Sequence, residues 1–176
     1  MYKDASELMS QCKEQNKRIW QIAVENEMKL TSSSYEDILS RFDDRLEIMF
    51  HSAQKALKAK QATKGGLIDG VAKTQYDYSK KENISGEYIN YVMSLAYSCS
   101  EVNASMGKIC ASPTAGSCGI VPAVLLGLSQ AKNISREKTL EGLITASAVG
   151  AIYTKNATVA GADGGCQAEC GVARSM

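Results

Sequence analysis

The distribution of glycine and proline divides this chain of 176 residues into two unlike parts. Residues 1–64 contain neither residue and carry most of the charge, whereas all 14 glycines and both prolines lie from Gly65 onward. The first composition suits uninterrupted helices, and glycine-rich loops are places where a backbone can approach a ligand. We therefore predict N-terminal charged helices over residues 1–64 and helices joined by functional loops over residues 65–176, within one domain.

Helical patterns cover most of the chain, and no segment shows the period-two alternation of a strand, so the predicted fold class is all-α. From Ile38 to Leu57, apolar residues keep a 3.6-residue period over about five turns. We expect this helix to be the longest and to pack in the core, and we assign no catalytic role to His51 beside its stripe. Further helices are expected to open at Asp4, Ser33 with Glu36, Ser85, Pro122, Ser135 and near Cys166, with loops over residues 60–70 and 156–165.

Charge and hydropathy exclude several classes of function. The net charge is +1, so no general attraction to nucleic acid or to an anionic membrane is indicated. The longest apolar run, residues 119–128, is too short to span a bilayer and contains Pro122. The N-terminal text MYKDASELMS has no apolar signal region, so we expect a cytoplasmic protein.

Six cysteines are present, and in a reducing compartment they are expected to be buried thiols, metal ligands or nucleophiles instead of disulfides. No CxxC pair and only one histidine occur, so a zinc-finger site fails on ligand count. A cysteine protease has no support either, because the histidine has no recognisable context.

The stretch ICASPTAGSCGIVP, residues 109–122, cannot be one helix because Pro113 and two glycines interrupt it. Small residues leave backbone N–H groups free ahead of a helix, an arrangement that suits a carboxylate or a phosphate. A tight turn between two packed helices explains the same residues. The candidate binding residues of this PTAGS loop are Ser112, Thr114, Gly116 and Ser117.

The second stretch, GADGGCQAECG, places Cys166 after two glycines, where a helix is expected to start. A helix N-terminus lowers the pKa of a thiol and favours the thiolate, the form that attacks substrates and binds metals. Cys170 follows at i+4 and would share a helix face with Cys166. This pair alone is a weak metal signal.

Taken together, the two stretches make the chain resemble the alpha subunit of the iron–sulfur-dependent bacterial L-serine dehydratases (L-serine ammonia-lyases). The matching text is EVNASMGKICASPTAGSCGIVPAVLLG, residues 101–127, with NATVAGADGGCQAECGVARSM, residues 156–176. Enzymes of this family eliminate water from L-serine and release pyruvate and ammonia. They use a 4Fe-4S cluster instead of pyridoxal phosphate, and the fold of their catalytic part is helical.

The resemblance implies a helical catalytic core over residues 65–176, with Cys166 as a cluster ligand. It also implies that the PTAGS loop orients L-serine through its carboxylate, that the loop and Cys166 face one cleft, and that a beta subunit and further copies of the chain are partners. Neither nucleic acid nor membrane is an expected partner, and the resemblance leaves the general base unnamed.

This chain departs from the family pattern in several places. The family's other ligands lie in a CDP…PC segment that is absent here, so they are expected beyond Met176, and the 176-residue chain is not expected to hold a stable cluster alone. Cys170 stands where the family has an aliphatic residue and is interpreted as a packed thiol. An apolar groove is expected beside Val159, Val172 and Met176. Asp69, in GGLIDGVAK, has no assigned role.

Two alternatives remain open. A related cluster-dependent lyase could act on L-cysteine, because the sequence does not separate a hydroxyl from a thiol leaving group. The other alternative is a catalytically silent helical fragment that only binds a partner subunit.

A separate hypothesis concerns the cluster. If Cys118, Cys166 and Cys170 lay close together, they would form an improvised cluster site within this chain.

Overall fold

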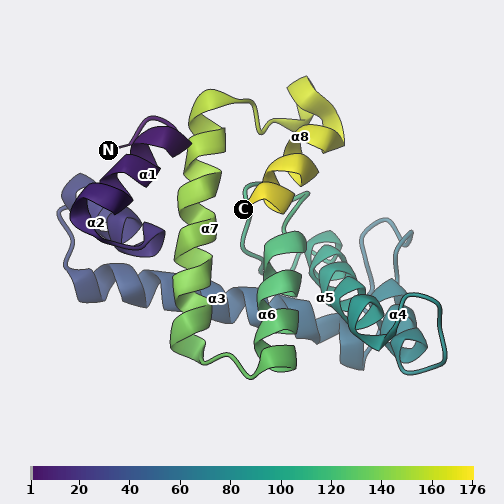
Figure 1. Cartoon of the computed structure of the whole chain (residues 1–176). Coiled ribbons are helices and arrows are strands. Elements are labelled where there is room, and N and C mark those ends of the chain that lie inside the picture. Colours follow the sequence, from purple (N-terminus) through teal and green to yellow (C-terminus); the bar gives the residue numbers. More distant parts are fainter. Residues whose placement is uncertain (1) are drawn as a thin grey trace.

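The computed structural model describes residues 2–176, and over this range the chain forms eight helices and no strand (Figure 1). The predicted all-α fold class is therefore confirmed. The helices are α1 (Ala5–Gln15), α2 (Ile19–Thr31), α3 (Tyr35–Lys58), α4 (Val71–Ser79), α5 (Glu87–Ala104), α6 (Ile120–Lys132), α7 (Arg136–Asn156) and α8 (Gly161–Ser175).

The longest helix, α3, crosses behind α7 and α6 and contacts both of them as well as α5 (Figure 1). Its 24 residues contain the predicted range Ile38 to Leu57. The apolar stripe is buried at Leu46, Met49 and Ala53. Because burial of a leucine or methionine side chain contributes about 1.5–3 kcal/mol, this stripe is a main stabilising element of the fold.

The start of α3 differs from the prediction by one residue. Ser34, not Ser33, is the N-cap, and its hydroxyl accepts the backbone N–H of Asp37 at 3.1 Å. The Asp37 carboxylate accepts the N–H of Ser34 in return. Ser33 and Glu36 fit the same sequence pattern, but the Ser33 hydroxyl accepts a hydrogen bond from Thr31 at the end of α2, which leaves Ser34 as the cap.

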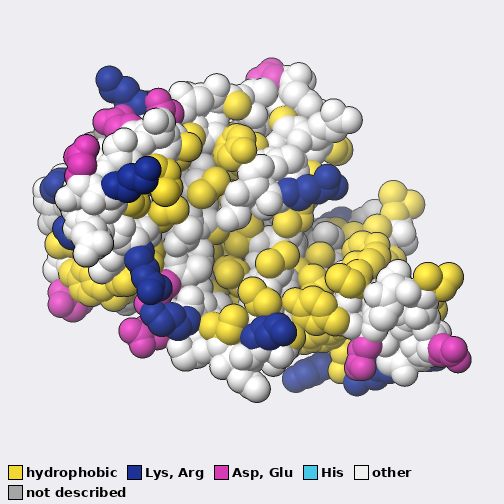
Figure 2. Space-filling view, in the orientation of Figure 1, with side chains coloured by type: hydrophobic (Ala, Val, Ile, Leu, Met, Phe, Trp, Pro, Cys, Tyr) yellow, Lys and Arg dark blue, Asp and Glu magenta, His cyan; other side chains and the backbone are white. Residues whose placement is uncertain are grey.

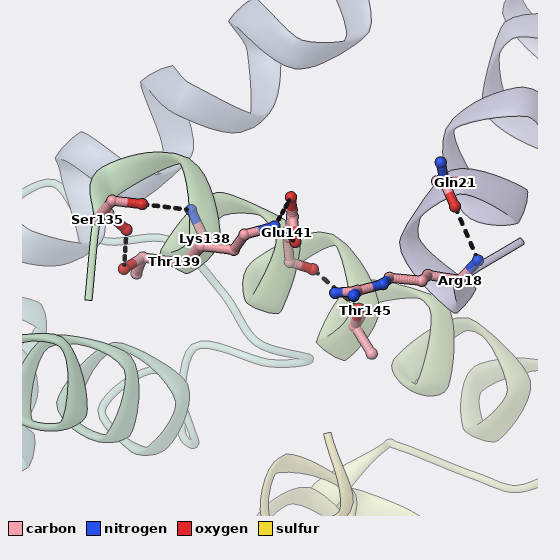
Figure 3. A network of polar contacts seen from close by, with 7 residues as sticks. All are labelled: Arg18, Gln21, Ser135, Lys138, Thr139, Glu141 and Thr145. Carbon is pink, nitrogen blue, oxygen red and sulfur yellow. Dashed lines mark hydrogen bonds and ion pairs between the residues drawn. The ribbon is translucent and has the colours of Figure 1, made fainter. Parts of the chain in front are cut away.

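Helix α7 begins at the predicted cap. The Ser135 hydroxyl accepts the backbone N–H of Lys138 at 3.3 Å, and its carbonyl accepts the hydroxyl of Thr139 (Figure 3). The Lys138 ammonium pairs with Glu141 one turn later. Figure 3 also shows the side chain of Arg18, from the start of α2, reaching toward this part of α7. Local capping therefore fixes where α7 begins, beside the helix that it packs against.

Helices α5 and α6 approach closely because two glycines face α5. A Cβ on Gly119 would lie 2.5 Å from the carbonyl oxygen of Ala96, and a Cβ on Gly127 would lie 2.6 Å from a methyl of Val92. The approach closes a core cluster that includes Leu95, Cys99, Cys118, Ala123 and Leu126. The loop that precedes α6 is thereby held against a rigid pair of helices.

Replacing Gly119 by alanine is expected to lower the free energy of unfolding by about 1–3 kcal/mol. The added methyl meets the backbone of α5, which cannot rotate away as a side chain can. Gly171→Ala in α8 is the control, because nothing lies within 4 Å of its Cβ position, and it is expected to stabilise by about 0.4–1 kcal/mol. Urea unfolding midpoints measure both, and equal midpoints for the two variants would contradict the close approach.

The last helix begins earlier than predicted. It starts at Gly161 instead of near Cys166, so residues 161–164 are helical and the predicted loop is correct only up to position 160. Gly165 then interrupts the helix with φ 65°, a conformation that glycine adopts at little cost. Cys166 consequently opens the second half of α8, which agrees with its predicted place at a helix start.

The apolar groove expected at the chain end is only partly present. Val172 is buried, and Met176 lies against Gly150 of α7, where a Cβ would be 2.8 Å from its terminal methyl. The prediction is wrong at Val172, which is buried, whereas Met176 is partly buried and lines a pocket. Exposed apolar side chains gather instead over α5 and α6 (Figure 2) and include Ile89, Met93, Tyr97, Val124 and Leu128. No helix in the described range has the length and apolarity to cross a membrane.

Candidate functional site

The PTAGS loop, residues 112–117, is closed by its own hydroxyl groups. The Ser117 hydroxyl donates to the carbonyl of Ser112 at 3.0 Å and lies 3.2 Å from the hydroxyl of Thr114. The Thr114 N–H also points to the Ser117 oxygen, at 3.4 Å. Since Ser117 is buried and its hydroxyl is used within the loop, its contribution is to hold the loop in shape.

One face of the loop touches α8. A Cβ on Gly116 would lie 2.8 Å from Oε2 and 3.2 Å from Oε1 of Glu169, so only a glycine lets this carboxylate lie so close to the loop. Glu169 also lies against Gly161, at the beginning of the same helix. The side chain of Glu169 makes no hydrogen bond to another of residues 2–176. Its carboxylate is placed by van der Waals contacts and can accept a proton or a hydrogen-bond donor.

Cys166 lies one helical turn before Glu169. Residues at i and i+3 are neighbours on a helix surface, with Cβ atoms about 5–6 Å apart, so Cys166 and Glu169 share a face of α8. The thiol of Cys166 is exposed. The contact between Gly116 and Glu169 therefore brings the PTAGS loop beside the turn that carries Cys166, across more than forty intervening residues. That the loop and Cys166 face one cleft stays a prediction.

Backbone donors line the same part of the loop. The N–H groups of Ala115 and Gly116 make no hydrogen bond within residues 2–176, and both residues are exposed. The carbonyl of Ala115 accepts the side-chain amide of Asn103 at 3.1 Å, which ties this segment to the end of α5. Two free N–H groups ahead of a helix are donors for a carboxylate.

The other face of the loop borders a cavity of about 290 Å³ that is partly open to solvent. Ser112 lies on this side and is buried, and its hydroxyl has no hydrogen-bond partner in the described part of the chain. The four predicted binding residues are thus divided: Gly116 faces α8, Ser112 faces the cavity, and the hydroxyl groups of Thr114 and Ser117 hold the loop together.

The thiols fall into distinct environments. Cys12, Cys99 and Cys118 are buried, and burial raises the pKa of the Cys99 thiol to about 12 and that of Cys118 to about 11. Cys118 packs in the core between α5 and α6 and is kept as a neutral thiol, so it does not join Cys166 and Cys170 in an improvised site. That hypothetical grouping is wrong because the close packing of α5 and α6 turns this side chain inward.

The donor set for a 4Fe-4S cluster is incomplete in the described range. Such a cluster takes three or four thiolates. Cys166 is an exposed thiol at a helix start, and Cys170 is partly buried one turn later. Within residues 2–176, no three side chains of His, Cys, Asp or Glu come together in a way that could hold a metal ion. Among the six thiols, Cys166 is the one that is exposed.

Two further candidates from the sequence have ordinary surroundings. His51 is exposed and borders a hollow formed with Glu47, Ile48 and Lys108. Asp69 accepts hydrogen bonds from the backbone and the hydroxyl of Thr63, which lower the pKa of its carboxyl group, and it braces the loop ahead of α4.

Sequence reasoning missed Glu169. It stands three residues after Cys166 in the GCQAE text, and that spacing places both on one helix face, so the sequence carried a usable signal. Its contact with Gly116 has no such signal, because it depends on how α8 packs on the loop before α6.

Comparison with known proteins was made over the whole sequence. Residues 14–176 match the family model described as serine dehydratase alpha chain. The L-serine dehydratase alpha chain of Peptoniphilus asaccharolyticus is 41% identical over 177 residues, which cover 100% of this chain and 61% of that protein. The probable L-serine dehydratase alpha chain of Bacillus subtilis (strain 168) is 37% identical, and the match covers 59% of that protein. L-serine dehydratase 1 of Escherichia coli (strain K12) is 30% identical, and the match covers 39% of its length. The chain thus spans about three fifths of the length of the two alpha chains.

Proposed function

The chain belongs to the serine dehydratase alpha chain family, and from this premise we propose that it takes part in the conversion of L-serine to pyruvate and ammonia. The observation that carries the proposal is the meeting of the PTAGS loop with α8, where the free carboxylate of Glu169 lies between Gly116 and the turn of Cys166. The groups that support the proposal are a carboxylate that touches the loop, two backbone donors of that loop, and an exposed thiol one helical turn from the carboxylate.

Recognition of the substrate is assigned to the loop. The carboxylate of L-serine accepts the N–H groups of Ala115 and Gly116, which have no other partner within the described residues. Asn103 and Ser117 hold that backbone in place. Binding holds the α-carbon of L-serine in one orientation relative to the catalytic groups. This orientation contributes several kcal/mol to the lowering of the activation barrier.

The proton transfer is assigned to Glu169. Its carboxylate takes the α-proton of L-serine, the electron pair of that C–H bond becomes the Cα–Cβ double bond, and the hydroxyl leaves Cβ and receives the proton back from Glu169, so that it departs as water. The aminoacrylate that results gains a proton at Cβ and loses one from nitrogen to become an imine, which water hydrolyses to pyruvate and ammonia. Glu169 suits this role because no side chain or backbone donor of the described residues occupies its oxygens.

Cys166 is proposed as one ligand of a 4Fe-4S cluster. Its exposed thiol at the start of a helical segment suits the thiolate that a cluster requires. When bound, a cluster with an open iron position supplies Lewis acidity toward the substrate hydroxyl, which is a poor leaving group. Since no three side chains of His, Cys, Asp or Glu within residues 2–176 are placed to hold a metal ion, the proposal draws the other ligands from outside this range.

The reaction is tested by anaerobic reconstitution with iron and sulfide, followed by assay of pyruvate from L-serine and from L-cysteine. The chain is compared with a form extended by the segment that follows the matched region in the Peptoniphilus relative. We expect the extended form to release pyruvate from L-serine. Release from L-cysteine alone would favour the cysteine lyase, and iron uptake with no pyruvate from either amino acid would favour a silent partner-binding chain.

Replacing Cys166 by serine is expected to abolish most of the iron uptake of the extended form, because one of three or four thiolates is lost. Cys170→Ser is the matched control, one turn along the same helix, and is expected to keep the iron content. Iron and sulfide per chain, with the visible absorbance of the cluster, are the measurements. Equal iron content in both variants would remove Cys166 from the ligand set.

A partner chain is also proposed, because two of the relatives are named as alpha chains. Affinity purification of the tagged chain from its own cells, followed by measurement of the mass of the complex, tests both a beta subunit and self-association. A single chain of 18.9 kDa in solution would contradict both.

A further inference from the structure

The pocket beside Ser112 lies between α3, α7 and the PTAGS loop and is open to solvent on the side of the exposed residues Arg41 and Arg45, and the proposed reaction does not use it. Its volume is about 290 Å³, which is within reach of a small organic molecule. The wall is formed by Glu27, Ile38, Arg41, Phe42, Arg45, Met49, Cys110, Ala111, Ser112, Leu143, Ser147 and Met176.

Positive charge dominates the polar part of the lining. Arg41 and Arg45 are at i and i+4 on α3, and the guanidinium of Arg45 donates to the carbonyl of Arg41 at 2.7 Å. Neither guanidinium has an ion-pair partner within residues 2–176, whereas Arg136 nearby on α7 is paired with Asp43 and Glu47. The lining has one acidic residue, so the cavity carries an unmatched positive charge that favours an anion.

Ser112 adds an unpartnered donor inside the cavity. Its side chain is 3% exposed, and its hydroxyl makes no hydrogen bond within the described range. A buried hydroxyl left without a partner costs about 1–3 kcal/mol, and an acceptor atom of a ligand would remove that cost. The hydroxyl of Ser147, also in the lining, is a second donor.

The rest of the wall is apolar. Ile38, Phe42, Met49 and Leu143 belong to α3 and α7, and Met176 closes one side. One part of the wall carries two guanidinium groups and two hydroxyl groups, and the other part is hydrocarbon. Such a wall is complementary to a molecule with one anionic end and a short apolar body. A carboxylate fits the planar fork of an arginine through two parallel hydrogen bonds.

We propose that this cavity is a binding site for a small organic carboxylate, held by Arg41, Arg45 and the hydroxyl of Ser112. Of the four candidate loop residues the site uses only Ser112, and the proposed reaction assigns proton transfer to Glu169 and substrate binding to the N–H groups of Ala115 and Gly116, so the two proposals are tested separately. Cys110, whose thiol also lines the cavity beside Arg45, provides an internal reporter.

The reporter is alkylated by iodoacetate, which carries a carboxylate, and in parallel by neutral iodoacetamide. In each case the thiolate of Cys110 displaces iodide. The neutral thiol N-acetylcysteinamide, added to the same solution, is the reference. We expect the iodoacetate-to-iodoacetamide rate ratio, measured by mass spectrometry, to be about tenfold higher at Cys110 than at this reference thiol, because the arginines attract the carboxylate.

The variant with Arg41→Gln and Arg45→Gln is expected to bring the ratio at Cys110 down to that of the reference thiol. Lys55→Gln, which removes an exposed charge of the same helix outside the cavity, is the control and should leave the ratio unchanged. Circular dichroism and a urea midpoint establish that each variant is folded. Equal ratios at Cys110 of the unaltered chain and at the reference thiol would overturn the proposal.

Direct binding covers the case in which Cys110 reacts with neither reagent. Calorimetric titration with pyruvate, acetate and L-serine is expected to show millimolar binding that Ser112→Ala weakens and the double arginine variant abolishes. Binding of L-serine alone would identify the source as the substrate, and binding of pyruvate and acetate would identify a general carboxylate site. No heat from any of the three at about 50 mM would refute the site. Glu169→Gln is expected to leave this binding unchanged, so the result is separable from the fate of the proposed reaction.

Discussion

Replacing Glu169 by glutamine is expected to lower kcat for pyruvate release from L-serine by about 10²–10⁴-fold, because the base that takes the α-proton is lost. The amide has nearly the same shape as the carboxylate, so the contact with Gly116 and the fold are expected to persist. KM is expected to change little, since the carboxylate of the substrate is assigned to the loop and not to this side chain.

The measurement is steady-state kinetics of the reconstituted, extended form, with iron content determined on the same samples. Glu169→Asp withdraws the carboxylate by one methylene and is expected to retain an intermediate rate. Glu14→Gln, an exposed carboxylate of α1, is the control and should leave kcat unchanged. If Glu169→Gln keeps the full kcat with the normal iron content, another group is the base, although the family assignment would stand.

Replacing Glu101 by alanine is expected to lower the free energy of unfolding by about 3 kcal/mol. Glu101 is fully buried in α5, and its carboxylate accepts the backbone N–H of Ala72 at 2.6 Å and that of Gln61 at 3.4 Å. The first contact satisfies the N-terminus of α4, whose N-cap, Gly70, has no side chain to do so. Alanine would leave a buried N–H unpaired and an empty space beside it.

The effect is measured as the urea midpoint, with hydrogen exchange of the Ala72 amide as the local readout. Glu101→Gln keeps a carbonyl oxygen for Ala72 and is expected to recover part of the loss. Glu36→Gln at the exposed start of α3 is the control and should change the midpoint by less than about 0.5 kcal/mol. If the Ala72 amide keeps its protection in the alanine variant, the buried carboxylate does not hold α4.

Helix α4 illustrates what local patterns miss. It is nine residues long and was not among the predicted helices, since its apolar spacing is weak and it has no capping side chain of its own. An isolated helix of this length is marginal in water, so its stability comes from contacts made elsewhere. The cap is Glu101, 29 residues further along the chain.

The amino-acid sequence by itself determined the all-α class, the long helix from Ile38 to Leu57, the cap at Ser135 and the family, through the PTAGS and GCQAE texts. These features depend on interactions between residues within about four positions of each other, or on short motifs. Both can be recognised in the amino-acid sequence without knowledge of the fold. It could not decide between a ligand cradle and a tight turn for the PTAGS loop.

Tertiary structure alone decided how the loop residues are divided. Packing of α8 against the loop put Gly116 beside Glu169, and packing of α3 and α7 placed Ser112 and two arginines around one cavity. Cys118, only a few residues away, was turned into the core by the glycine contact between α5 and α6. Neighbouring residues on an irregular loop point in different directions, and which neighbour each one meets is set by helices that are distant in sequence and close only after folding.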